Sequence, residues 1–263
     1  MSRDRRVVIA SVSSAVDGGF TAISDVSTAI AAAGTGNEHR LIGGIAVMLH
    51  VQRLGLALPI RATGDADFGV PRHVLREAHL VAEIENLGYS KVAGNRWERK
   101  LDATRVAAVD LLVPAYRSRA RSNVRVGKVV STEVPGLAEA LRRPGIPLEV
   151  DLLLTDRSTL SAAVVLPDAL GTLALKTRVR SVRNEHRDVE DLWRCLEIAA
   201  ADGVTPTDLD ATQSLRELRE LLWNELGPEG RALPVLTQDL SDRVAAQRRT
   251  RVRALLTEVV GTP

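Results

Sequence analysis

The spacing of hydrophobic and polar residues predicts alternating helices and strands over the first half of the chain. Apolar residues recur at helical spacing in two segments, and short apolar runs typical of strands lie beside them. The expected helices cover residues 24–33 and 44–54, and the expected strands cover residues 40–42 and 65–70. Pro71 then opens a helix that runs to about Leu87 and ends at Gly88, as proline favours the first turn of a helix and glycine the position after its end. The first half therefore reads as α/β.

Further along the chain, the pattern changes from strands to helices. Strands are expected at residues 89–93, 96–101, 105–113, 124–131 and 148–154. Gly, Pro and polar turns separate these runs, which predicts a mixed sheet. After Pro167 the spacing becomes helical, and helices are expected at residues 169–182, 188–201, 207–226 and 236–260. The predicted fold class is α/β (α+β), with a mixed-sheet lobe over residues 1–160 followed by a helical lobe over residues 161–263.

The amino-acid composition limits which classes of protein the chain could belong to. The 263 residues are 45% apolar and 26% charged, which is enough apolar material for one large core or two modest ones. Aromatic residues make up only 3%, so the base-stacking platforms of many single-strand RNA binders would be scarce. The formal net charge is only +2, but arginines cluster at positions 117, 119, 121 and 125 and again at 178, 180, 183 and 187. Each cluster could position phosphate groups or could be ordinary solvated surface.

Cysteine content and hydropathy bear on location. Cys195 is the single cysteine, so neither an internal disulfide nor a multi-cysteine metal site is available. The segment after Met1 lacks the apolar core of a signal peptide, and no run approaches the roughly 18 apolar residues that cross a bilayer. A cytoplasmic location is expected.

A pair of glycines, Gly43 and Gly44, stands between a predicted strand and a predicted helix. Glycines let the backbone approach a triphosphate closely, and the start of a helix directs unpaired N–H groups toward anionic oxygens. A glycine pair by itself is most often only a turn. Whether this pair binds phosphate therefore depends on the residues that follow it in the sequence.

Two aspartates, Asp65 and Asp67, begin the next predicted strand. Residues two apart on a strand project to the same face, so both carboxylates can bind one hard cation such as magnesium, Mg2+. A third acid on a neighbouring strand would permit a two-metal site for in-line transfer. Asp110 is the candidate for this third ligand, Asp151 is the rival, and an edge-strand acid facing solvent is the alternative for either.

A second Asp-x-Asp pair, Asp208 and Asp210, serves as an internal control. It follows Thr205 and Pro206 at a predicted helix start, where capping and the helix macrodipole explain acidic residues without any metal. The surroundings of Asp65 and Asp67, not the pair itself, indicate a metal site.

These motifs resemble the polymerase-beta-like nucleotidyltransferase superfamily, whose signature is a Gly-Gly or Gly-Ser turn, an Asp-x-Asp and a later acid. Downstream, residues 173–178 and 187–192 look like the Lys and Arg/Lys-Asp-x-x-Asp-Leu elements of AbiEii and MenT toxins of toxin–antitoxin systems. The resemblance spans residues 41–192. It implies an enzyme that moves an NMP from an NTP to an acceptor, with RNA, specifically a tRNA 3' end, as the expected acceptor and an antitoxin protein as a partner.

Carried over residue by residue, the resemblance implies metal binding by Asp65, Asp67 and Asp110, and catalysis that also uses Lys176 and Asp188. Nucleotide contacts are expected from Gly43, Gly44, Thr63 and Lys176. Three of these residues have an ordinary alternative: Thr63 as a strand-start threonine, Lys176 as a solvated helix lysine, and Asp188 as a helix cap. Asp191 is expected to be structural, pairing with Arg187 or Arg194 across one helical turn.

The chain departs from the family pattern in two places. The interval between Gly44 and Asp65 is longer than the compact pattern, and Gly44 stands where the family often has serine. Catalysis is compatible with both departures.

Two other functions stay open: transfer of a nucleotide to a small molecule of the aminoglycoside type, and an inactive nucleotidyltransferase fold that serves as a binding module.

Overall fold

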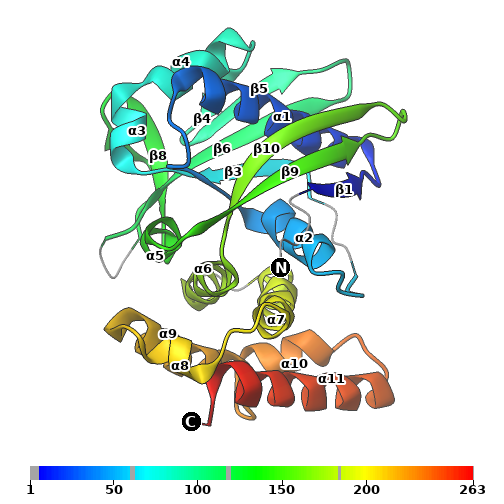
Figure 1. The fold of residues 1–263 in the computed structure, drawn as a ribbon. Helices are drawn as coiled ribbons and strands as arrows, with labels where there is room; N and C mark the ends of the chain where they lie inside the picture. The colour runs from blue at the N-terminus through cyan, green and yellow to red at the C-terminus, as the bar shows by residue number, and fades with distance from the viewer. Residues whose placement is uncertain (1–5, 60–62, 117–119, 183–184, 263) are drawn as a thin grey trace. The chain divides into compact units, whose positions relative to one another are not determined.

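The computed structural model describes residues 6–59, 63–116, 120–182 and 185–262, which form two compact units (Figure 1). The first unit covers Met1–Asp168 and the second Ala169–Pro263. The fold is mixed α/β, as the sequence predicts, with both sheets in the first unit and helices in the second. The expected boundary after residue 160 lies inside strand β10 (Thr159–Pro167), whereas the units divide after Asp168.

The larger sheet of the first unit is built around its longest strand, β6 (Val106–Pro114). Strands follow the order β2, β3, β6, β5, β4, and β8 pairs with both β6 and β7. The other members are β2 (Arg40–Ile42), β3 (Asp65–Gly69), β4 (Ser90–Ala93), β5 (Arg96–Lys100), β7 (Val124–Val126) and β8 (Val129–Val134). The predicted strand 124–131 is thus a tight hairpin, which turns at Gly127 with φ +60°.

The smaller sheet has the order β1, β9, β10, with β1 (Arg6–Ala10) parallel to β9 (Gly145–Leu153) and β10 antiparallel to it. The sequence analysis placed neither β1 nor β10. Only the tertiary structure supplies the partner of β1, because β9 lies far from β1 in the sequence.

Helix α1 (Ser14–Ala33) begins ten residues before the predicted helix start at residue 24. Ser13 caps it by accepting a hydrogen bond from the Val16 N–H. Gly18 and Gly19 let the helix lie directly against the sheet. A Cβ at Gly18 would come within 2.2 Å of the Val106 carbonyl oxygen, and one at Gly19 within 3.0 Å of the Gly64 backbone. The helix therefore packs against the residue that precedes Asp65.

The remaining helices of the first unit are short, apart from α2 (Gly43–Arg53). They are α3 (Arg72–Glu77), α4 (His79–Asn86) and α5 (Leu137–Arg142). The single helix predicted from Pro71 to Leu87 is divided at Ala78, whose φ of 62° interrupts the helical hydrogen bonding. The core contains Phe20 from α1, Phe68 from β3 and Trp97 from β5, all fully buried.

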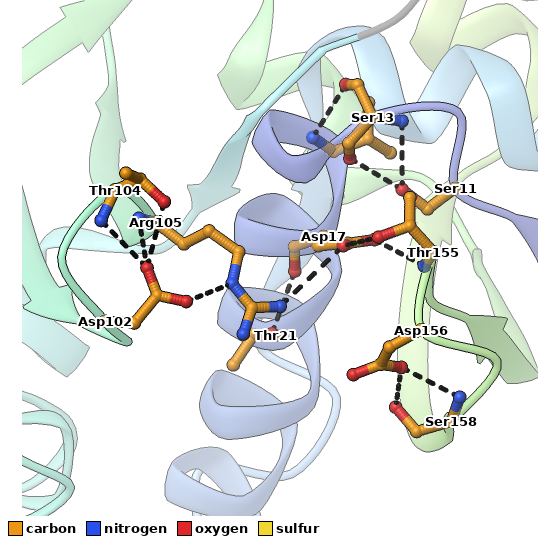
Figure 2. Close-up of polar contacts among 11 residues, drawn as sticks. Ser11, Ser13, Asp17, Thr21, Asp102, Thr104, Arg105, Thr155, Asp156 and Ser158 are labelled. Atoms are coloured by element: carbon orange, nitrogen blue, oxygen red, sulfur yellow. Dashed lines mark hydrogen bonds and ion pairs between the residues drawn. The ribbon is translucent and has the colours of Figure 1, made fainter.

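A buried carboxylate, Asp17 of α1, joins three segments at one end of the first unit (Figure 2). It accepts hydrogen bonds from the Thr155 backbone N–H at 3.0 Å and the Thr155 hydroxyl at 2.5 Å, and Arg105 lies 3.9 Å away. Burial by itself raises the pKa of Asp17, but hydrogen bonds from Ser11 and Thr155 and the charge of Arg105 outweigh it, so the pKa is lowered. Asp17 therefore stays ionised and connects the β9–β10 turn to α1.

The second unit contains helices α6 (Ala169–Val182), α7 (His186–Ala201), α8 (Pro206–Asp210), α9 (Gln213–Leu226), α10 (Ala232–Thr237) and α11 (Asp242–Leu255), followed by a π-helix (Leu256–Val260). The predicted helix 169–182 is confirmed as α6. Longer predicted helices are divided, at 211–212 and again at 238–241. Over the described part of the chain, none of the helices has the length and apolar character needed to cross a bilayer.

Candidate active site

The turn between β2 and α2 requires glycine at position 43. Gly43 has φ +76°, in the left-handed region that other residues rarely adopt. A Cβ there would stand 2.0 Å from Oδ2 of Asp67, so a side chain would collide with that carboxylate. Ile42, at the N-cap of α2, offers no side-chain acceptor to the first turn. The helix therefore begins beside Asp67, and its N-cap residue makes no side-chain capping bond.

The three predicted metal ligands share one face of the larger sheet. Asp65 and Asp67 alternate with buried residues along β3, so both project to its half-exposed side. Asp110 of β6 stands directly opposite Asp67, since the two are partners in the parallel register. Glu98 of β5 lies opposite Ala108, on the same side. We call these four carboxylates the acidic face.

Arg96, the first residue of β5, bonds three members of the acidic face. Its Nη2 donates to Asp65 Oδ1 at 2.8 Å and its Nη1 to Asp110 Oδ2 at 3.2 Å. Its Nε donates to Glu98 Oε1 at 2.7 Å. Partial burial lowers the pKa of Arg96, but the bonds to Glu98 and Asp65 raise it more, so the guanidinium is fully charged.

Asn95 directly precedes β5. It lies where the partner of β6 changes from β5 to β8. Its side-chain N–H donates to Asp110 Oδ1 at 2.7 Å, and its side-chain oxygen accepts from the Thr132 hydroxyl at 2.7 Å. Its backbone carbonyl accepts from the Leu111 N–H at 2.9 Å. Asn95 is therefore fixed by two strands and holds one oxygen of Asp110 in place.

The environment of Asp110 differs from that of Asp65 because its side chain is 14% exposed, against 49% for Asp65. Burial raises the pKa of Asp110; Arg96 opposes this, and the nearby charge of Asp65 raises the pKa again. The net shift is upward. The positive charge of Arg96 thus offsets part of the upward shift that burial causes.

The acidic face has the donor chemistry that magnesium prefers, namely carboxylate oxygens from adjacent strands. Among the described residues, however, no three Asp, Glu, His or Cys side chains converge closely enough to hold a metal ion. Arg96 bonds to the carboxylate oxygens of Asp65 and Asp110 that such an ion would use. The residues fit the ion in kind, and Arg96 occupies one oxygen each of Asp65 and Asp110 in this structure.

The rival third acid, Asp151, lies in the other sheet. It is on β9, where it pairs with Arg6 at 2.7 Å and accepts a bond from Ser161. Only Asp110 is next to Asp67 in register. Thr63 is half-buried and stands two residues before β3 begins.

Lys176, one of the two predicted site residues of the helical lobe, belongs to a buried network within the second unit. Lys176 of α6 donates to Asp191 Oδ2 of α7 at 2.8 Å, and Arg194 pairs with the other oxygen of Asp191 at 3.2 Å. The expected Asp191–Arg194 pair is confirmed. Lys176 is not a solvated lysine, because only 13% of its side chain is exposed. Asp188 is buried in the first turn of α7, where an acid is favourable next to the helix dipole.

The control pair behaves as expected. The Asp208 carboxylate accepts from the Thr205 backbone N–H at 2.8 Å and from the Thr205 hydroxyl at 2.9 Å, completing a capping box. Asp210 pairs with Arg219 at 3.0 Å. This second Asp-x-Asp is confirmed as a helix start.

The arginine clusters are largely bonded within the protein. Arg121 pairs with Glu133 and Arg187 with Glu185, while the Arg180 side chain is 5% exposed and pairs with Glu225. Arg178 donates to Ser214. Arg125 is exposed on β7. Positions 117, 119 and 183 lie outside the described residues. The sequence clusters therefore do not translate directly into basic patches.

Sequence reasoning missed Arg96, Asn95 and Glu98. Arg96 and Glu98 alternate along a predicted strand, and Gly94-Asn95 has the composition of a turn. Neither pattern shows that β5 lies beside β6, which is what brings them to Asp110.

Comparison with known proteins finds similarity to solved structures but not to protein-family models or curated sequences. No protein-family model matches the chain, and no curated protein sequence matches it. Among solved structures, the chain is similar to the crystal structure of an antigenic nucleotidyltransferase-like protein from Paracoccidioides brasiliensis, with a TM-score of 0.49 and 15% sequence identity. The similarity covers 94% of this chain and 95% of that one.

Proposed function

We propose that the chain is a divalent-cation-dependent nucleotidyltransferase. The observation that carries the proposal is the contact of Gly43 with Asp67 at the start of α2, beside the acidic face that also includes Asp65 and Asp110. A close backbone turn at a helix start suits an anionic triphosphate, and adjacent carboxylates suit the cation that accompanies it. Both features support a nucleotide site at this place in the fold.

In the proposed reaction, an acceptor hydroxyl oxygen forms a bond to the α-phosphorus of the NTP. The bond between the α-phosphorus and its bridging oxygen breaks, pyrophosphate leaves, and the hydroxyl proton passes to solvent. When bound, magnesium would be held by Asp65, Asp67 and Asp110 and would offset negative charge on the phosphates. The residues of the chain orient the triphosphate through the first turn of α2 and fix Asp110 through Asn95.

The proposed acceptor is RNA, specifically a tRNA 3' end, and the proposed biological role is that of a toxin-like enzyme with a cognate antitoxin. The sequence resemblance supports both. Nucleotide contacts by Thr63 and Lys176, and a catalytic role for Asp188, have the same support and stay predictions. Transfer to a small molecule uses the same site, and a salt titration separates the two acceptors. RNA binding weakens steeply with salt because phosphate contacts release counterions, whereas binding of a small acceptor depends on salt much less.

The test is incubation of the purified chain with each labelled NTP, Mg2+ and total RNA, followed by identification of the labelled product. We expect label in RNA with one or more NTPs, and we expect Asp65→Ala and Asp67→Ala each to reduce transfer by at least about 100-fold, the scale of losing a major electrostatic contribution to catalysis.

Two control variants separate the proposed site from other acids. Asp208→Ala removes a capping acid, and Asp151→Asn changes an acid of the other sheet, so both should retain transfer when they fold. Wild-type turnover in Asp65→Ala or Asp67→Ala would refute the site. Binding of NTP without any transfer would favour the inactive binding module.

A further inference from the structure

The Arg96 guanidinium engages carboxylate oxygens that a divalent cation would need. Asp110 has two oxygens, and both accept hydrogen bonds: Oδ1 from Asn95 and Oδ2 from Arg96. Asn95 is anchored by its bonds to Thr132 and Leu111, on β8 and β6. Arg96 is the partner of Asp110 that can leave.

Arg96 has the features of an exchangeable partner. Its side chain is 32% exposed, and the Asp65 side chain that it bonds is 49% exposed, so solvent reaches this ion pair. Ion pairs that solvent reaches contribute little net stability, so they exchange partners at little cost. A cation with two positive charges competes well for the same oxygens.

We propose that Arg96 changes partners when substrate binds. In the ligand-free chain it neutralises Asp65 and Asp110; once a divalent cation takes those carboxylates, its guanidinium binds a phosphate of the nucleotide. Arginine suits this second role because its planar fork matches phosphate oxygens in a bidentate geometry. The inference rests on the proposed function, and it assigns Arg96 a nucleotide-binding role that no motif indicates.

The test measures binding in the absence of any acceptor, so that turnover plays no part. Mn2+ is titrated into the purified chain and followed by electron paramagnetic resonance, and a non-hydrolysable NTP analogue is then titrated in excess Mg2+ by calorimetry. The variants are Arg96→Met and Arg96→Lys. Arg125→Met is the matched control, because it removes an arginine that is exposed on β7 of the same unit.

Opposite changes are expected from the two titrations. Arg96→Met should bind Mn2+ about three to ten times more tightly than the wild type, since the ion pairs of Arg96 with Asp65 and Asp110 no longer compete with the cation. It should bind the analogue at least about tenfold more weakly, since a charge-assisted phosphate contact is lost. Arg96→Lys should keep near wild-type Mn2+ affinity and bind the analogue at an intermediate level. Arg125→Met should match the wild type in both titrations.

The outcomes separate this inference from the proposed function. If the wild type binds Mn2+ and the analogue but Arg96→Met changes neither, Arg96 is structural and the inference fails while the function stands. Weaker Mn2+ binding by Arg96→Met also overturns it. If the wild type binds neither probe, the proposed function fails and the inference fails with it. A misfolded Arg96→Met leaves Arg96→Lys to decide, because unchanged analogue affinity in that variant contradicts a bidentate phosphate contact.

Discussion

Gly43 illustrates how one residue position can be required by two independent constraints. Its φ of +76° favours glycine on conformational grounds, and the Asp67 carboxylate occupies the space where a Cβ would stand. Gly55 meets only the first constraint: its φ is +64°, and nothing lies within 4 Å of its would-be Cβ. Comparing substitutions at Gly43 and Gly55 therefore separates the effect of backbone strain from the effect of displacing Asp67.

We expect Gly43→Ala to weaken Mn2+ binding and abolish transfer, because the new Cβ displaces Asp67 from the acidic face. Gly55→Ala should cost about 1–2 kcal/mol of stability, the strain of a left-handed alanine, and should leave Mn2+ affinity unchanged. Urea denaturation and Mn2+ titration of both variants check this. Equal Mn2+ affinities in Gly43→Ala and the wild type would show that Asp67 is not a ligand.

At the scale of elements, the acidic face depends on how closely α1 packs against the sheet. Gly18 contacts the Val106 carbonyl at the start of β6, and Gly19 contacts Gly64, which precedes Asp65. A glycine inside a helix normally costs about 1 kcal/mol relative to alanine, so its presence at position 18 reflects packing.

We predict that Gly18→Ala destabilises the first unit by about 1–3 kcal/mol, the cost of overpacking, although alanine is the better helix former. The collision is with a backbone oxygen of β6, which cannot move without shifting the strand that carries Asp110. Thr28→Ala, at an exposed site of α1, should be neutral or slightly stabilising. Chemical denaturation of both variants measures the difference. A stabilised Gly18→Ala would mean that α1 lies farther from the sheet.

At the scale of the whole molecule, the buried and ionised carboxylate of Asp17 makes the stability of the fold depend on pH. Asp17 bonds Thr155 with both its oxygens, and Arg105 adds a positive charge nearby. Its pKa is lowered in the folded chain, so the stabilising contribution is fully present above the unfolded value of about 3.9 and is lost as the pH falls through the folded pKa.

We therefore expect Asp17→Asn to cost about 1–3 kcal/mol at neutral pH, the range for hydrogen bonds to a charged group. The gap between variant and wild type should narrow when unfolding is measured below about pH 4, where the wild-type carboxylate takes up a proton. Asp156→Asn is the comparison, because Asp156 is exposed and accepts its side-chain hydrogen bonds from nearby Ser158, so a smaller cost at neutral pH is expected. A gap that is constant from pH 7 to pH 3 would contradict a lowered pKa at Asp17.

The sequence by itself determined the local elements around the candidate site. Strand 40–42, the adjoining helix and the strand that begins at Asp65 follow from short-range patterns of apolar residues, glycine and proline, and the structure has them within one residue at each end. The mixed α/β class and the capping role of Asp208 follow in the same way, since the forces that fix them act within a few residues.

Only the tertiary structure decided which of these elements are neighbours. The choice of Asp110 over Asp151 depends on β6 pairing with β3 while β9 pairs with β1, and sequence spacing carries no information on long-range register. Arg96 and Asn95 reach Asp110 for the same reason. Strand pairing is set by burial summed over the whole sheet and not by the residues of one strand, so the carboxylates were predictable one by one, while the arginine that joins them was not.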